Sequence, residues 1–306
     1  MSSIEDQEDP KVMAISGASG MVGSALSKAA AQKGWSVIPM VRRRDLQGIY
    51  WSVEDDEIDV EALQGVDAVV HLAGENIAGS RWNKAHKRAI KESREKGTQL
   101  VAEAIAELEE PPAVFICASA VGYYGHTGDE WVDESSASGE GFLAEVCRCW
   151  EAACEPARRV ACRVVNARLA MIISPDGGAL EKMLLPFQLG VGGRLGDGTQ
   201  FMSWVSLEDV VRALLFAIEE AEIDGALNVT SPNPVTNAEF TDALGKVLGR
   251  PTLLPVPAAM LKLAVGAQMA DEMLLRGQRV KPKKLLESGF GFEHRELSDA
   301  LGWALQ

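Results

Sequence analysis

The chain has 306 residues, a formal net charge of −14 and five cysteines. A core of this size needs no disulfide framework, and an odd number of cysteines is typical of a reducing compartment. The four histidines are scattered and none is spaced with cysteines as a zinc site requires, so we expect no metal. The acidic charge disfavours nucleic acid as a partner, and the lack of 18 consecutive apolar residues predicts no membrane span.

The first motif follows an apolar run near the N-terminus. Residues 12–15 (VMAI) predict a strand buried on both faces, and residues 21–33 predict a helix. Between them three glycines recur at every third position, the G-x-x-G-x-x-G variant of the dinucleotide-binding fingerprint. The glycines permit a tight turn and a close approach of backbone, and the helix directs its first amides at a phosphate. A tight turn without a ligand is the alternative. The residues expected to contact a dinucleotide here are Gly17, Ala18, Ser19, Gly20, Met21, Val22 and Gly23.

Three arginines follow the second expected strand, residues 37–41 (VIPMV). An acidic residue at this point accepts from the ribose 2′-OH of NAD, whereas arginine pairs with the 2′-phosphate of NADP. Arg42, Arg43 and Arg44 therefore favour NADP(H), with Arg42 and Arg43 as the expected contacts. An ordinary basic loop is the alternative.

The remaining pattern alternates strands with helices. Strands are expected at 68–72, 114–119, 161–168 and 226–229, and helices at 83–108, 141–158, 207–221 and 236–248, with an acidic solvated loop at 54–61. This alternation predicts an α/β fold with a doubly wound parallel sheet of the Rossmann type, which binds ligands at the carboxyl ends of its strands. Further cofactor contacts are expected there from Leu72, Ala73, Gly74, Glu75 and Arg168.

The composition changes along the chain and indicates four segments. We expect an acidic tail at 1–10, a Rossmann domain at 11–232, and within it a glycine-rich inserted pocket segment at 175–204. Residues 233–306, which begin with a helix and then become rich in proline, are expected to form a smaller C-terminal α/β lobe on the substrate side.

Several long and unusual motifs support a resemblance to a known family. They are SGASGMVG, HLAGENIAGSRWN, KESREKGTQL, SAVGYYG, GGALEKMLLPFQLGVGGRLGDGTQFMSW, NPVTNAEF and PKKLLESGFGF. Over nearly all of its length the chain resembles epimerase-family group 39U of the atypical extended short-chain dehydrogenases/reductases. That group places a nucleotide-sugar-epimerase-like Rossmann domain before a C-terminal domain of unknown function. The resemblance implies NADP(H) and a sugar-nucleotide-like or other small polar substrate.

The catalytic residues of that superfamily are not all present. Its chemistry uses a tyrosine that passes a proton while hydride moves to or from nicotinamide, a lysine four residues on, and a serine on the preceding strand. The helix expected to carry Tyr-x-x-x-Lys reads FLAEVCRCWE at 142–151 and has neither residue. Ser119 matches the strand serine, and Tyr123 or Tyr124 is the substitute acid, although both tyrosines are equally suited to packing or to a substrate wall. Cys147 is a weaker nucleophile candidate, because a cysteine on a helix is more often a small core residue.

Two functions remain open. The first is an NADP(H)-dependent oxidoreductase or epimerase with non-standard acid and base residues; the second is a cofactor-binding scaffold, redox sensor or subunit whose catalytic residues have lapsed. The polar residues of the glycine-rich segment either contact the substrate or form hydrogen bonds within their own loop. Its candidates are Arg194, Asp197, Gln200, Ser203 and Trp204. An unidentified small molecule is the expected substrate, and a homodimer or a larger complex is an expected assembly.

The expected compartment follows from the N-terminus and from the resemblance. The first residues are acidic and lack an apolar core, so they resemble neither a signal peptide nor a transit peptide. Relatives in this family occur in bacteria, mitochondria and plastids. We expect a soluble protein of the cytoplasm, or of the plastid stroma or mitochondrial matrix if a transit peptide has been removed.

Overall fold

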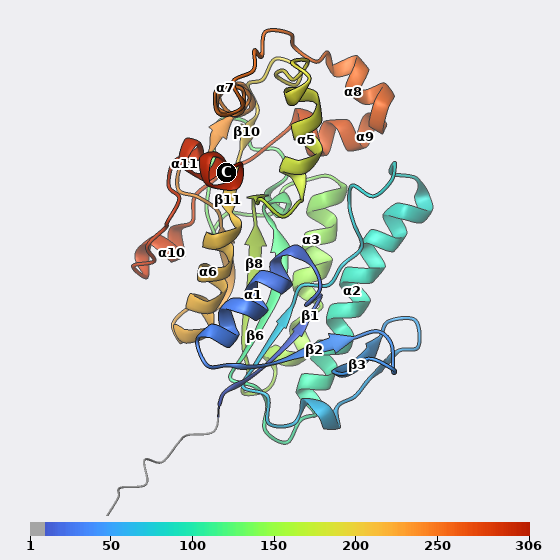
Figure 1. Cartoon of the computed structure of the whole chain (residues 1–306). Helices are drawn as coiled ribbons and strands as arrows, with labels where there is room; N and C mark the ends of the chain where they lie inside the picture. The colour runs from blue at the N-terminus through green and yellow to red at the C-terminus, as the bar shows by residue number, and fades with distance from the viewer. Residues whose placement is uncertain (1–9) are drawn as a thin grey trace, which may run out of the picture.

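The centre of the molecule is an eight-stranded sheet. The computed structural model describes residues 10–306, so nearly all of the expected acidic tail lies outside the described residues. Seven strands run parallel, and only the edge pair β3 and β4 is antiparallel (Figure 1). In spatial order the strands are β12 (Gly225–Val229), β8 (Arg163–Leu169), β6 (Val114–Ala120), β5 (Ala68–His71), β1 (Val12–Ser16), β2 (Ser36–Val41), β3 (Ile49–Ser52) and β4 (Glu57–Ile58). This confirms the expected α/β fold with a doubly wound parallel sheet.

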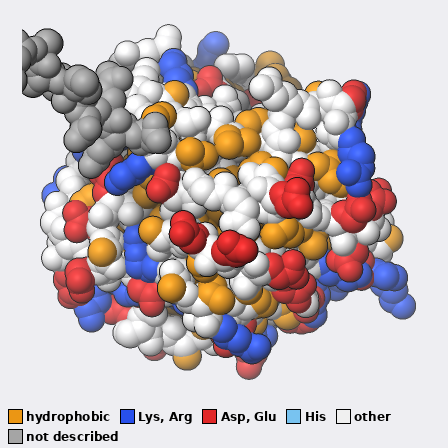
Figure 2. Space-filling view, turned by 90° about the horizontal axis from the view of Figure 1, so that it is seen from below, with side chains coloured by type: hydrophobic (Ala, Val, Ile, Leu, Met, Phe, Trp, Pro, Cys, Tyr) orange, Lys and Arg blue, Asp and Glu red, His pale blue; other side chains and the backbone are white. Residues whose placement is uncertain are grey.

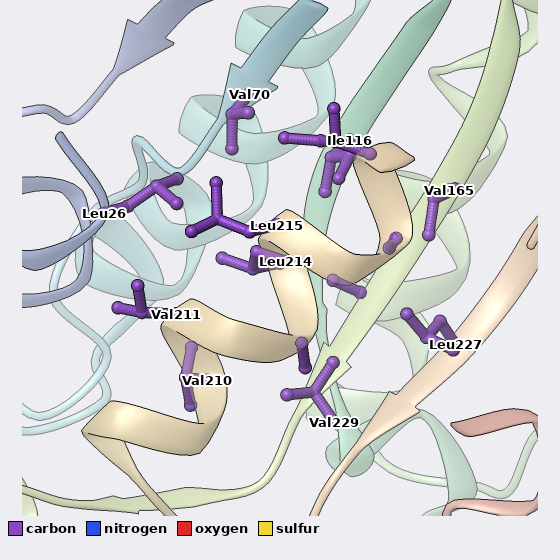
Figure 3. Packing of buried hydrophobic residues seen from close by; sticks show 14 of the residues in the cluster. Leu26, Val70, Ile116, Val165, Val210, Val211, Leu214, Leu215, Leu227 and Val229 are labelled. Carbon is purple, nitrogen blue, oxygen red and sulfur yellow. The ribbon is translucent and has the colours of Figure 1, made fainter. Parts of the chain in front are cut away.

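Apolar side chains cover both faces of this sheet. Along β1, Met13 and Ile15 join the core on one face while Ala14 joins the core on the other. Successive residues of a strand point to opposite faces, so an unbroken apolar run is what a strand between two layers of helices requires. The first face is covered by α1 (Met21–Gln32) and α6 (Leu207–Glu219), and Figure 3 shows α6 presenting Val210 and Leu214 to the strands. The second is covered by α2 (Lys84–Glu107), α3 (Phe142–Ala152) and α4 (Glu155–Arg158).

Two local predictions were wrong. The helix expected at 141–158 ends at Ala152, and a separate short helix begins at Glu155 with Pro156 in its first turn. Proline lacks an amide hydrogen and its ring collides with the preceding turn, so it is tolerated only at a helix start. The acidic stretch at 54–61 was expected to be a loop, but its residues 57–58 form β4, which pairs with β3.

A smaller lobe lies over the carboxyl ends of the strands (Figure 1). It has its own core, in which Trp204 and Phe187 pack with Phe240 and Leu301. The core therefore takes residues from the 175–204 segment as well as from 233–306. The helices of the lobe are α5 (Ala179–Gln188), α7 (Asn237–Leu248), α8 (Ala258–Val265), α9 (Ala267–Ala270) and α11 (Leu297–Ala304). The helix α10 (Lys283–Glu287) packs instead beside β12, where Leu285 joins the core of the large sheet. The division at residue 232 stays a prediction.

Short strand pairs connect the two parts of the molecule. They are β9 (Met171–Ile173) with β11 (Trp204–Ser206), β10 (Phe201–Met202) with β13 (Val235–Thr236), and β7 (Trp131–Val132) with β14 (Arg279–Val280). Three short helical turns complete the elements: η1 (Glu61–Leu63), η2 (Val121–Tyr124) and η3 (Asp271–Leu275). The segment expected to consist of loops at 175–204 thus contains the helix α5 and parts of two strand pairs.

The surface reflects the acidic composition. Seen from below, Asp and Glu side chains lie across the middle of the face and Lys and Arg lie mainly toward its edge (Figure 2). Among residues 10–306, no helix is both long and apolar enough to cross a membrane.

Candidate functional site

The glycine motif forms a compressed turn between β1 and α1. Gly17 has a φ of +68°, a conformation that other residues adopt only with strain. A Cβ on Gly23 would lie under 3.0 Å from the Gly17 carbonyl oxygen, closer than side chains approach backbone. A Cβ on Gly17 would lie 3.1 Å from the backbone of Ala73 at the end of β5. The motif therefore brings β1, β5 and the start of α1 into direct backbone contact.

The first turn of α1 offers free amides at this point. Its N-cap is Gly20, which has no side chain to cap the helix, and the turn contains no acidic residue. Among residues 10–306, the amides of Met21, Val22 and Gly23 donate to no protein acceptor. A helix N-terminus with free amides and a partial positive charge binds phosphate groups.

A serine fixes the neighbouring end of β5. The Ser16 hydroxyl oxygen accepts from the amides of Leu72 and Ala73 at 3.1 and 3.3 Å, and lies 2.7 Å from Nδ1 of His71. Burial lowers the pKa of His71 to about 4, so this ring is neutral. The pairing of Ser16 with His71 joins the ends of β1 and β5, and the order of the parallel strands reverses between these two strands. Such a reversal is the usual ligand position in this class of sheet.

The three arginines after β2 are not equivalent. Arg43 forms an ion pair with Asp45, and Arg44 forms one with Glu57 while its guanidinium lies over the ring of Tyr50. Arg42 is exposed and has no ion-pair partner among residues 10–306. Arg42 is therefore the arginine most available to a 2′-phosphate.

The candidate catalytic residues meet in a buried network at the ends of β6, β8 and β12. Arg168 donates to both carboxylate oxygens of Glu151 at 2.8 Å, and the Ser119 hydroxyl donates to the same carboxylate at 2.7 Å. Arg168 also donates to the Tyr124 hydroxyl at 2.9 Å, and that hydroxyl donates to Asn228 at 2.7 Å. The structure therefore places Arg168, expected to contact the cofactor, within the same cluster as Ser119 and Tyr124.

The two tyrosines occupy different environments within this cluster. Tyr124 is 3% exposed, and its hydroxyl both donates to Asn228 and accepts from Arg168. Burial raises its pKa to about 12. Tyr123 is half-buried, its ring centroid lies 3.5 Å from the Arg168 guanidinium, and its hydroxyl makes no hydrogen bond to residues 10–306. Of the pair, only Tyr123 keeps a hydroxyl that is free to meet a ligand.

Cys147 is a buried thiol on α3. Its Sγ lies 3.7 Å from the Ala120 carbonyl oxygen, and burial together with the negative charge of Glu151 raises its pKa to about 11. A nucleophilic cysteine needs the opposite shift, toward the thiolate. The environment thus favours the interpretation of Cys147 as a core residue.

The expected substrate contacts are dispersed. Trp204 is fully buried and donates to the Asn233 carbonyl, and Gln200 donates to the carbonyls of Leu195 and Leu274. The environments of Gln200 and Trp204 favour structural roles for these two residues. Arg194 is exposed, whereas Asp197 lines a hollow of about 450 Å³ together with Arg279. Ser203 bonds to backbone groups of Gln278 and Val280.

Three residues of the site were missed by the sequence analysis. Glu151 and Asn228 complete the network, and Arg94 is a buried arginine of α2 packed against Gly74. Arg94 lies in a segment of alternating Lys and Glu that predicts a solvated face. No sequence signal separated it from its exposed neighbours.

Two family models match the chain. The model of the NAD dependent epimerase/dehydratase family matches residues 13–230, and that of a domain of unknown function matches residues 256–304. The chain is 47% identical over 295 residues to an epimerase family protein of Mycobacterium bovis, covering 96% of this chain and 97% of the relative. It is 36% identical over 291 residues to human epimerase family protein SDR39U1, covering 94% and 97%.

A solved structure extends the likeness to three dimensions. The crystal structure of human SDR39U1 with NADPH matches with a TM-score of 0.88 and 34% sequence identity, covering 96% of this chain and 98% of that one. One family model matches more than half of the chain, and the relatives match nearly its whole length. The chain belongs to the NAD dependent epimerase/dehydratase family.

Proposed function

We propose that the protein binds NADP(H) and acts as a short-chain dehydrogenase/reductase-like oxidoreductase or epimerase with a non-standard active site. The observation that carries the proposal is the free N-terminus of α1, whose first amides follow the compressed turn that Gly17 and Gly23 permit. The human relative solved with NADPH supports the choice of cofactor.

The residues present fit this cofactor from end to end. Arg42 lies at the end of β2 to pair with the 2′-phosphate, and the amides of Met21 and Val22 would bind the pyrophosphate. Beyond β1 in the strand order, Gly74 follows the end of β5 and Tyr123 follows β6, so these residues lie on the side where the nicotinamide half would extend. When bound, NADP(H) supplies or accepts the hydride.

Tyr123 is the proposed acid. Its hydroxyl is uncommitted, and the Arg168 guanidinium on its ring face favours the negative charge that develops as the proton leaves. Glu151 holds Arg168 in place, so Glu151 acts as a positioning residue. Ser119 donates to Glu151, and in this arrangement it would have to rotate before it could polarise a substrate carbonyl.

The second candidate function is a scaffold that binds cofactor without turning over a substrate. It is favoured by the hydroxyls of Ser119 and Tyr124, since both donate to protein acceptors rather than to open space. It is favoured further by α3, which carries no tyrosine or lysine.

Single-turnover oxidation of bound NADPH separates these functions. The protein would be mixed with NADPH and a panel of nucleotide sugars, aldehydes and quinones, and absorbance at the nicotinamide band followed. We expect turnover with one class, lost on Tyr123→Phe and kept on Tyr124→Phe after correction for folded fraction. Turnover that survives Tyr123→Phe would refute that acid, and no turnover with bound NADPH would favour the scaffold.

A further inference from the structure

Arg94 is a buried cation without a carboxylate partner. The two arginines among the buried residues of the described chain are Arg94, 7% exposed, and Arg168, 4% exposed. Arg168 is neutralised by Glu151, whereas no carboxylate oxygen of residues 10–306 lies within 4.0 Å of the Arg94 guanidinium nitrogens. An uncompensated charge in a protein interior is costly, and it persists where a ligand or another function uses it.

The surrounding residues hold this guanidinium in one place. Nη1 donates to the carbonyls of Glu75 and Ile90 at 3.0 and 3.2 Å. The guanidinium carbon lies 4.8 Å from the ring centroid of Trp150 on α3. The group also packs on Gly74, where an added Cβ would lie 3.1 Å from Cζ. Three elements, α2, α3 and the end of β5, thus position one charge.

The remaining donors of this group are unused. Nε is buried and has no hydrogen-bond partner, and Nη2 donates to no protein acceptor in residues 10–306. Two hydrogen bonds from Nη1 leave most of the donor capacity of an arginine unsatisfied. Such a group is completed by an acceptor that the protein itself does not provide.

The order of the strands identifies that acceptor. From β2 through β1 and β5 to β6, neighbouring strands are about 4.8 Å apart. The 2′-phosphate belongs at β2 and the pyrophosphate at β1, so the nicotinamide riboside extends over β5 and toward β6. Arg94 is packed beneath the end of β5 and beside α3, which faces β6.

We propose that Arg94 binds the nicotinamide ribose of NADP(H) through Nη2, donating to its hydroxyl oxygens, and supplies the fixed positive charge that α3 lacks. This inference rests on the proposed cofactor function. The missing lysine would have provided such a charge from α3. Arg94 provides it from α2, which covers the same face of the sheet and packs against α3.

A pair of ligands tests the inference on the intact protein. NADPH contains the nicotinamide riboside, whereas adenosine 2′,5′-bisphosphate keeps the 2′-phosphate and lacks that half. For Arg94→Gln, calorimetric titration is expected to show NADPH binding weakened by tenfold or more and adenosine 2′,5′-bisphosphate binding unchanged within twofold. Arg88→Gln, an exposed arginine of the same helix, is the matched control and should leave both affinities unchanged.

Arg94→Lys is a second variant, which keeps the test valid if Arg94→Gln fails to fold. Lysine keeps the charge, but its ammonium has one nitrogen and lacks the planar fork in which Nη1 holds the Glu75 carbonyl while Nη2 is directed at a ribose. The ratio of NADPH affinity to adenosine 2′,5′-bisphosphate affinity should therefore fall several-fold. An unchanged ratio in whichever variant folds would overturn the role of Arg94. If the unmodified protein binds neither ligand, the proposed function itself fails.

Discussion

Glu151 and Arg168 form a bidentate ion pair in the interior. Arg168 Nε donates to Oε1 of Glu151 and Arg168 Nη2 donates to Oε2, both at 2.8 Å. Their side chains are 14% and 4% exposed. Burial alone would lower the pKa of Arg168, but the hydrogen bonds and charge of Glu151 raise it above its ordinary value. The pair therefore keeps a permanent cation under the ring of Tyr123.

Removing Glu151 should destabilise the protein strongly. Glu151→Ala leaves the Arg168 charge buried without a partner, for which the expected loss of unfolding free energy is about 3–5 kcal/mol. Glu92→Ala is the control, because Glu92 pairs with Arg88 and Lys96 on the exposed side of α2 and should cost at most about 1 kcal/mol. Urea unfolding measures both variants. Equal losses would show that the Arg168 pair contributes no more than a surface pair.

A methyl group at Gly23 should abolish cofactor binding. Gly23→Ala places Cβ against the Gly17 carbonyl, so α1 must move away from β1 and its first amides lose their position for a phosphate. Gly302→Ala is the matched substitution, since a Cβ there meets nothing within 4 Å and should stabilise α11 by up to about 1 kcal/mol. NADPH titration of both variants checks this. The same affinity in Gly23→Ala and unmodified protein would contradict the geometry of the turn.

Stability should depend on pH through His71. Burial lowers its pKa from 6.5 to about 4, so between these values the unfolded chain binds the proton and the folded chain does not. The contribution is complete above pH 6.5 and is lost as the pH falls toward 4. From pH 7.5 to 5.5 the expected loss from this group is about 1 kcal/mol.

Comparison with His71→Asn isolates this effect. Asparagine does not titrate but can still hydrogen-bond to Ser16, so its unfolding free energy should fall less over the same pH interval. Urea unfolding of both proteins at pH 7.5 and 5.5 gives the difference. Parallel losses in the two proteins would assign the pH dependence to other groups.

Arg42 should decide between the two nicotinamide cofactors. Arg42→Ala removes a charge-assisted bond to the 2′-phosphate and should weaken NADPH binding by about 1.5–3 kcal/mol, with NADH binding nearly unchanged. Arg43→Ala should have a smaller effect, since Arg43 is already paired with Asp45. Titration with both cofactors measures the selectivity. Equal losses for NADPH and NADH in Arg42→Ala would rule out this contact.

The sheet could be predicted from the sequence because its central strands are unbroken apolar runs. Residues 12–15 and 114–119 could be buried only between two layers of helices, and the glycine spacing marked the turn before α1. The edge was less readable. The strand β3 (Ile49–Ser52) is short and β4 consists of two residues within an acidic stretch, so pairing rather than composition defines them.

The site was only partly readable, because its key contacts join distant segments. Ser119 and the tyrosine pair stood out beside a strand end, but their partner Asn228 is about a hundred residues away on β12. In the sequence, Arg94 and Arg88 both lie among the charged residues of α2. Only the packing of Arg94 against Gly74 and Trp150 in the folded protein distinguishes it from the exposed Arg88. Burial of a charged side chain is a property of the folded molecule.

The central claim is that a dinucleotide carrying a 2′-phosphate lies between the end of β2 and the N-terminus of α1. Fluorescence titration of the purified protein with NADPH and with NADH tests it most directly. The account predicts saturable binding of NADPH, tighter than that of NADH by at least about tenfold. A factor of this size corresponds to the free energy of one charge-assisted hydrogen bond to the 2′-phosphate. No saturation with NADPH, or equal affinity for both cofactors, would contradict it.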